Sequence, residues 1–232
     1  MTQCGKILSG KVCYASLLIF SILAIAYFLP GNLLSGFLPD GVVRFRIAYP
    51  VAVLFLGGLM AGLDWQFAIA FLFSCTGDAF GAGGSFIGQM GFFALAHVMF
   101  IWGFIRGLRV ISTGSTDAKE RIWIGFGLAA VAAIMILAVA RVLPSIEDGV
   151  LVWGCGIYAL LICTMASLAM LQRSPAFALG ALLFAVSDLI LSWNLFVGPV
   201  AYEKYLVMLP YYLGQFLLWF GAVRKTSSTI KR

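Results

Sequence analysis

Long apolar runs separated by short polar or glycine-containing breaks follow one another along almost the whole chain. Within each run the apolar residues are continuous, with Leu, Ala, Phe and Gly prominent, and they do not alternate with polar residues. About 20 apolar residues cross the hydrocarbon core of a bilayer as an α-helix, whereas a transmembrane barrel shows alternating segments of about ten residues. The pattern therefore predicts an all-α, polytopic membrane protein.

The runs divide the chain into about eight membrane-spanning helices within one integral membrane domain, residues 1–232. The predicted spans are approximately 14–29, 47–63, 65–80, 86–108, 122–143, 150–171, 175–196 and 205–223. Lys6 and Lys11 precede the first run, so a cleaved signal peptide is an alternative interpretation of it. Retaining the run gives an even number of spans, and the charges then agree with a single orientation.

The composition agrees with this class of protein. The 232 residues are 62% hydrophobic and 10% charged, whereas ordinary soluble domains are about 45–50% apolar. The formal net charge of +6 does not indicate nucleic-acid binding, because the basic residues are scattered at the ends of the predicted helices. At those positions Lys and Arg set the orientation of a membrane protein, since short cytoplasmic loops carry an excess of them.

Counting these charges predicts the side of each loop. With both termini in the cytoplasm, the inner segments carry eleven Lys and Arg residues and the outer loops carry four. The four outer residues are Arg44, Arg46, Arg141 and Lys204. Both termini are therefore predicted to be cytoplasmic. If the protein is bacterial, its predicted location is the cytoplasmic (inner) membrane.

Two acidic residues, Asp78 and Asp188, interrupt apolar runs, and the only histidine, His97, lies in the run that follows Asp78. An ionisable side chain at membrane depth costs about 2.5–3.5 kcal/mol on insertion scales and usually faces the bundle interior or a wet cavity. In the predicted orientation both acids lie about 20 Å above the inner side of a roughly 30 Å core. The predicted cavity in the outer half of the membrane also includes His97, Tyr211, Tyr212 and Gln215.

Neighbouring residues refine this picture. Ser74 and Asp78 are four residues apart on one helix face, so the Ser74 hydroxyl is expected to donate to the carboxylate. Ser187 and Asp188 are adjacent and are expected to point in different directions. For His97 the alternative is a neutral, buried structural histidine, and for the tyrosines and Gln215 it is hydrogen bonding between helices. The similarity of LFSCTGD to LFAVSD suggests an internal duplication.

These residue types leave three functions open. A carboxyl group in a low-dielectric environment favours its protonated form unless it is paired, which suits general acid catalysis with a second carboxylate orienting water. The same property suits a proton-coupled carrier of a small amphiphile, and a non-catalytic lipid-binding protein is the third possibility. Zinc hydrolases bind their metal mainly through several histidines, and this chain has one. Neither a metal nor another cofactor is predicted, and the oligomeric state is left open.

Four short motifs occur in order over about residues 71–215: S-x-x-G-D, G-F-F-x-x-x-H, G-A-x-L-F-x-x-S-D and Y-Y-x-x-Q. Their residues are Ser74, Gly77, Asp78, Gly91, Phe93, His97, Gly180, Ala181, Phe184, Ser187, Asp188, Tyr211, Tyr212 and Gln215. In this order the motifs resemble the lysoplasmalogenase family, also called YhhN-like membrane proteins. The chain departs from the family pattern at Phe100, often a tyrosine, at Gly214, usually an alanine, and at Arg46, near the usual Lys-Pro of the second span.

The resemblance implies a hydrolase that cleaves the vinyl-ether bond of lysoplasmalogens into a fatty aldehyde and a glycerophospho-alcohol, with a lysophospholipid and the bilayer as partners. Protonation of a vinyl ether at carbon gives an oxocarbenium ion that water captures, as in glycoside cleavage. Asp78 and Asp188 would be the joint catalytic pair. The implied substrate- or water-positioning residues are Ser74, His97, Ser187, Tyr211, Tyr212 and Gln215. Arg46 would bind the phosphate, although an ordinary interfacial arginine is the alternative.

Overall fold

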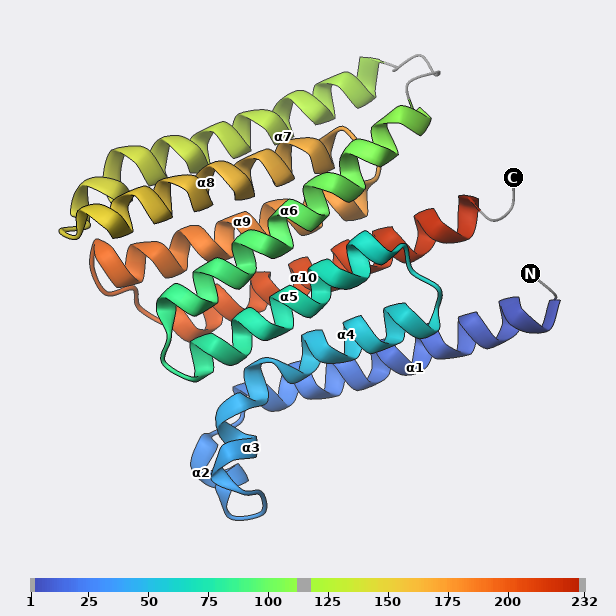
Figure 1. Cartoon of the computed structure of the whole chain (residues 1–232), viewed down its shortest axis with the longest axis horizontal. Helices are drawn as coiled ribbons and strands as arrows, with labels where there is room; N and C mark the ends of the chain where they lie inside the picture. The colour runs from blue at the N-terminus through green and yellow to red at the C-terminus, as the bar shows by residue number, and fades with distance from the viewer. Residues whose placement is uncertain (1–2, 112–117, 230–232) are drawn as a thin grey trace. The chain divides into compact units, whose positions relative to one another are not determined.

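The computed structural model describes residues 3–111 and 118–229, and within these ranges every regular element is a helix (Figure 1). This confirms the predicted all-α fold class. The chain forms two compact units, Met1–Met99 with Ala222–Arg232, and Phe100–Gly221. The unit boundaries fall inside two helices, α6 (Phe86–Ile111) and α10 (Glu203–Thr229).

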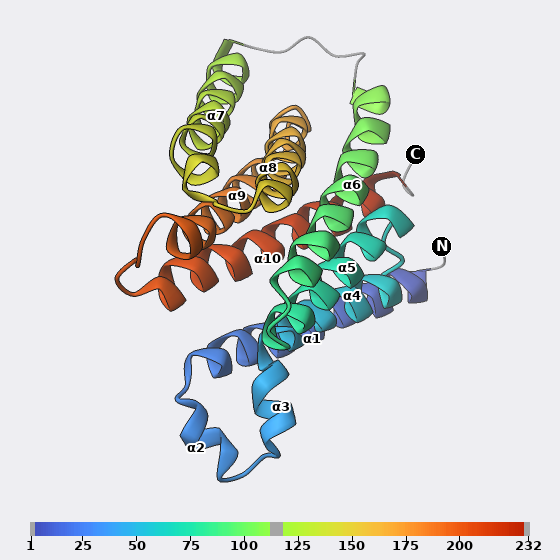
Figure 2. The same ribbon diagram turned by 60° about the vertical axis from the view of Figure 1, so that its left-hand side comes forward.

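The first unit is built around α4, which packs against both α1 and α5 (Figure 2). Its helices, besides the first part of α6 and the end of α10, are α1 (Gln3–Phe28), α2 (Gly31–Ser35), α3 (Asp40–Arg44), the 3-10 turn η1 (Phe45–Ile47), α4 (Tyr49–Met60) and α5 (Trp65–Ala82). Val51 and Leu54 of α4 are fully buried, as are Phe71 and Ala70 of α5. These apolar contacts place the helix that carries Asp78.

The predicted span at residues 47–63 corresponds mainly to the short helix α4, and the chain bends sharply where this helix begins. The preceding segment Asp40–Ile47 and the helix Tyr49–Met60 form a pair bent by 69°. Pro50 has no backbone N–H and is favoured in the first turn of a helix, so α4 begins at Tyr49 and the chain before it takes another direction. The 12 residues of α4 measure about 18 Å, less than the roughly 30 Å core. This segment is therefore a broken span or a re-entrant hairpin.

In the second unit, α8 packs against both α7 and α9 (Figure 1). Its elements, besides the second part of α6 and most of α10, are α7 (Ala118–Leu137), a π-helical turn η2 (Ala138–Val142), a 3-10 turn η3 (Leu143–Ser145), α8 (Gly149–Met170) and α9 (Pro175–Phe196). Asp148 caps α8, because its Oδ1 accepts hydrogen bonds from the backbone N–H groups of Val150 and Leu151 at 2.8 and 3.1 Å. Pro175 opens α9. Asp148 therefore fixes the start of α8 after η3, and Pro175 ends the short turn between the antiparallel helices α8 and α9.

Six helices in the described part of the chain are long and apolar enough to cross a membrane, and the bent pair could supply a seventh span. They are Gly10–Phe28, Phe86–Leu108, Glu120–Ser145, Gly149–Met170, Pro175–Phe196 and Glu203–Thr226. Each coincides with a predicted span, which confirms a multi-pass membrane protein. The predicted span at 65–80 forms α5, an 18-residue helix in which Gln66, Ser74, Thr76 and Asp78 lower the hydropathy. The number eight stays a prediction, as does the orientation, and residues 1–2 and 230–232 lie outside the described residues.

Candidate active site

Asp78 is buried on α5, with 2% of its surface exposed, where this helix closely approaches α6. At the preceding residue, Gly77, a Cβ atom would lie 3.2 Å from the Phe93 ring and 3.3 Å from the Gln89 carbonyl oxygen. His97 is fully buried one turn beyond Phe93 on α6. The first unit therefore buries both the acid and the histidine, on two helices that touch beside the acid.

The Ser74 hydroxyl is buried on α5 and, within the described residues, Oγ has no hydrogen-bond partner. The expected donation to Asp78 is therefore wrong. Side chains on a helix lean toward its N-terminus, which takes the short serine side chain away from residue 78. An unsatisfied buried polar group costs about 1–3 kcal/mol, so a fold retains one where a ligand or water satisfies it.

Asp188 is 9% exposed on α9 and accepts a hydrogen bond at Oδ2 from the phenol of Tyr158 on α8. Tyr158 is not among the residues predicted from the sequence, because it lies within a continuous apolar span. Comparing the depth of Tyr158 along its helix with that of Asp188 along the neighbouring helix would identify it. Tyr158 lies about 14 Å from the start of α8, and Asp188 lies about 12 Å from the end of the antiparallel α9, so the two side chains share one level.

Ser187 faces a different neighbour from Asp188, as predicted. Its hydroxyl donates to the Val207 carbonyl oxygen of α10 at 2.9 Å, and the bond is buried. The single hydroxyl proton of Ser187 is thus used in a contact between α9 and α10.

The aromatic residues of α10 form a buried cluster with α9. Tyr211 meets the Phe184 ring edge-on at a centroid distance of 5.3 Å, and Tyr212 lies 5.5 Å from Tyr211. Gln215, one turn further along, is fully buried. Among the described residues, neither its Nε2 nor its Oε1 has a hydrogen-bond partner. A buried amide in this state is suited to a ligand that offers both a donor and an acceptor.

Two glycines bring the backbones of α9 and α10 into contact. A Cβ at Gly180 would lie 2.9 Å from the Leu218 backbone nitrogen and 3.0 Å from the Gly214 carbonyl oxygen. A Cβ at Gly214 would lie 2.9 Å from the Gly180 carbonyl oxygen. Small residues allow this approach in membrane helices. In this chain a side chain at residue 214 would clash with the Gly180 carbonyl oxygen, so glycine fits the position. The contact fixes the helix bearing Gln215 against the helix bearing Asp188.

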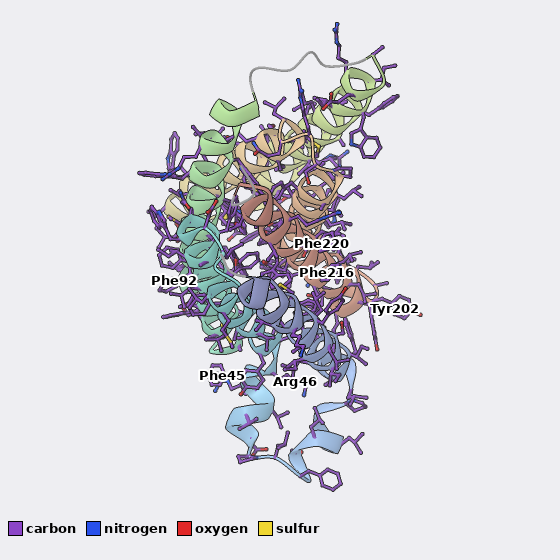
Figure 3. All side chains as sticks on the ribbon, turned by 90° about the vertical axis from the view of Figure 1, so that its right-hand side faces the viewer. Phe45, Arg46, Phe92, Tyr202, Phe216 and Phe220 are labelled. Carbon is purple, nitrogen blue, oxygen red and sulfur yellow. The ribbon has the colours of Figure 1, made fainter. Side chains whose placement is uncertain are left out.

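Arg46 lies on η1 and packs against the end of α1 (Figure 3). Its guanidinium carbon lies 5.6 Å from the centre of the Tyr27 ring, and its Nη1 would lie 3.2 Å from a Cβ at Gly31. Arg44 is used differently, because its Nε and Nη2 donate to the carbonyl oxygens of Ala82 and Gly83 at 2.9 and 3.0 Å. Those bonds cap the C-terminus of α5. Arg46 has an aromatic neighbour, which agrees with interfacial anchoring and leaves its phosphate role a prediction.

The YhhN family profile matches residues 42–222, and this range includes every candidate site residue named above. Tyr27 and Gly31, which contact Arg46, lie before it. The chain belongs to the YhhN family. It is 30% identical to the lysoplasmalogenase TMEM86B of Sus scrofa, a match that covers 72% of this chain and 68% of that protein. It is also 29% identical to the lysoplasmalogenase TMEM86A of Homo sapiens, over 80% of each chain. No solved structure matches the chain.

In this YhhN-family chain the candidate residues fall into two groups. The first unit holds Arg46, Ser74, Asp78 and His97, and the second holds Tyr158, Ser187, Asp188, Tyr211, Tyr212 and Gln215. A single cavity lined by both aspartates stays a prediction. Within the described residues, no group of three or more His, Cys, Asp and Glu side chains is arranged to hold a metal ion.

Proposed function

We propose that this protein hydrolyses the vinyl-ether bond of lysoplasmalogens, releasing a fatty aldehyde and a glycerophospho-alcohol. One observation carries the proposal: the matched segment, residues 42–222, contains two buried carboxyl groups, and the relatives that match most of the chain are named lysoplasmalogenases. If the protein is bacterial, we place it in the cytoplasmic membrane with both termini in the cytoplasm. A reporter fused to the C-terminus tests the topology, and an external reporter would contradict it.

The reaction needs an acid and a carboxylate, and we assign Asp78 and Asp188 jointly to these roles. The acid transfers its proton to the alkene carbon that is not bonded to oxygen, and the π electrons of the C=C bond form the new C–H bond. Positive charge then develops on the carbon attached to oxygen, where the carboxylate stabilises it. Water attacks this carbon and gives a proton to the carboxylate. The resulting hemiacetal breaks its bond to the glycerol oxygen, which takes the proton that the carboxylate received from water. The hemiacetal hydroxyl gives its own proton to the first aspartate, so the aldehyde is released and both aspartates return to their starting protonation states.

Other buried polar groups suit the polar end of the substrate. The Gln215 amide and the Ser74 hydroxyl have no hydrogen-bond partner among the described residues, so we assign them to the attacking water or the glycerol hydroxyl groups. His97, Tyr211 and Tyr212 would line the same site. Ser187 contributes through the bond that joins α9 to α10, because its proton is given to Val207.

The direct test compares a lysoplasmalogen with its saturated alkyl-ether analogue, using the purified protein in nanodiscs and measuring aldehyde. The saturated ether has no C=C bond to protonate, so aldehyde should form only from the vinyl ether. Formation from neither substrate would overturn the proposed function. Formation from both would overturn the protonation mechanism and leave an ether-cleaving enzyme.

Arg46 is the proposed phosphate contact, since a guanidinium can bind a phosphate through two hydrogen bonds. Arg46→Gln should raise KM about fivefold for a lysoplasmalogen and leave it unchanged for a 1-alkenylglycerol without phosphate, as expected for a lost charge-assisted contact. Arg44→Gln is the matched control, because Arg44 is used by the α5 carbonyl groups. An equal effect of Arg46→Gln on both substrates would show that Arg46 serves the fold.

A proton-coupled carrier of an amphiphile is the second candidate, because the first unit contains the 69° break between Ile47 and Tyr49. Secondary transporters build their midplane sites from discontinuous helices of this kind. Proteoliposomes with an imposed proton gradient separate the two functions. Uptake of lysolipid without aldehyde formation would favour the carrier.

A further inference from the structure

Tyr158 is a polar group on a helix that otherwise serves as apolar scaffold. It lies in the sequence VLVWGCGIYALLI of α8, and its side chain is half-buried. Its hydroxyl donates to Oδ2 of Asp188 across the contact between α8 and α9. A phenol has one O–H donor, and in Tyr158 this donor is used in the hydrogen bond to the carboxyl group.

The surroundings of Asp188 make this bond important for the geometry of the carboxyl group. The terminal torsion of an aspartate side chain is broad, so packing alone does not fix the plane of its two oxygens. On the α10 side, the adjacent Ser187 donates to the Val207 carbonyl oxygen. The bond from Tyr158 does reach the carboxyl group, and it restrains Oδ2 of Asp188 from the α8 side.

We propose that Tyr158 is a positioning residue for the hydrolysis, acting through its hydrogen bond to Asp188. The inference rests on the proposed function. Hydrolysis requires Asp188 to meet a carbon atom or a water molecule at a fixed distance and angle, and a misplacement of about 1 Å can cost about 100-fold in rate. Tyr158 restricts the carboxyl group before substrate binds, so its hydroxyl should influence kcat more than KM.

The test is Tyr158→Phe, which removes the hydroxyl and keeps the ring. We expect kcat to fall about tenfold, the order of one lost hydrogen bond to a carboxyl group, with KM unchanged. The thermal midpoint in detergent should fall by only about 2–4 °C, as expected for one lost hydrogen bond between helices. The matched control is Tyr49→Phe, because the Tyr49 hydroxyl donates at 3.1 Å to a backbone carbonyl oxygen, that of Val42. This control should keep the wild-type kcat.

Two further variants distinguish positioning from a role in the fold. Replacing Tyr158 with 3-fluorotyrosine retains the donor and should keep kcat within about twofold of wild type, even if Tyr158→Phe proves unstable. In an Asp188→Asn background, adding Tyr158→Phe should change the residual kcat by less than about twofold, because the two residues act as a unit.

The outcomes separate this inference from the proposed function. A wild-type protein that forms no aldehyde overturns the proposed function, and the role of Tyr158 with it. An active wild type together with a fully active Tyr158→Phe overturns only the role of Tyr158. Equal losses for phenylalanine and 3-fluorotyrosine, or additive losses with Asp188→Asn, would also overturn it, since they would place the effect in the ring or in a separate interaction.

Discussion

The two helices that carry the aspartates, α5 and α9, have similar sequences and different surroundings. Both place a serine and an acid after a Leu-Phe pair, in LFSCTGD and LFAVSD. On α9 the acid accepts from Tyr158 and the serine donates to α10. On α5 the serine hydroxyl has no partner among the described residues. The same residue type therefore stabilises helix packing in one helix and, in our proposal, serves the substrate in the other.

The largest expected effect comes from the acids, the feature the two helices share. Asp78→Asn and Asp188→Asn keep the shape of the side chain and remove its acid, so each should lower kcat at least about 100-fold, the lower end of acid–base contributions. Folding should survive, because neutralising a buried carboxyl group is often neutral or stabilising. Aldehyde formation and thermal unfolding in detergent measure the two properties. Full activity of either variant would refute the paired-acid mechanism.

The glycines that precede the acids should differ in their effect on stability. Gly180→Ala places a methyl group against the backbone of α10, which cannot move aside, and should cost about 1–3 kcal/mol of unfolding free energy. Gly77→Ala meets the Phe93 ring at 3.2 Å and the Gln89 carbonyl oxygen at 3.3 Å. It should cost less than Gly180→Ala, because both distances are longer than those at Gly180 and the ring can shift by a few tenths of an ångström.

Gly91→Ala is the control for both glycine substitutions. No atom lies within 4 Å of a Cβ at this position on α6, so the variant should match wild type or exceed it, since alanine is the better helix former. Unfolding by a denaturing detergent gives the order of the three variants. Equal losses of stability for Gly77→Ala and Gly180→Ala would contradict the proposed difference in helix packing between the two regions.

The smallest expected effect separates the two serines. Ser187→Ala removes a hydrogen bond between helices and should cost about 0.6 kcal/mol, the average for such bonds in a membrane protein. Ser74→Ala should leave stability unchanged and lower kcat/KM a few-fold, about the effect of one hydrogen bond to substrate or water. A stability loss at Ser74 larger than that at Ser187 would reverse the comparison.

The spans were predictable because a membrane helix requires a continuous apolar run, and six of the predicted runs form long apolar helices in the structure. The bend before α4 was not predicted. Pro50 marks where the helix starts, but the direction of the preceding segment depends on distant contacts such as the bonds from Arg44 to the end of α5.

The polar contacts were harder to predict. The i,i+4 rule gives the distance between Cβ atoms on a helix, but a serine side chain is too short and leans the wrong way to reach Asp78. Tyr158 went unnoticed because a tyrosine in an apolar span resembles any other aromatic residue. Only its depth relative to Asp188, on the neighbouring antiparallel helix, distinguishes it.

The direct backbone contact at Gly180 and Gly214 also bears on how the protein meets bilayers of different thickness. A hydrophobic span adapts to a thinner or thicker bilayer by tilting or by deforming the lipid around it. Where two backbones touch without intervening side chains, one helix cannot slide along the other without a steric clash. A change in lipid chain length should therefore tilt α9 and α10 together, and the relative heights of Asp188 and Gln215 should be the same in thin and thick membranes.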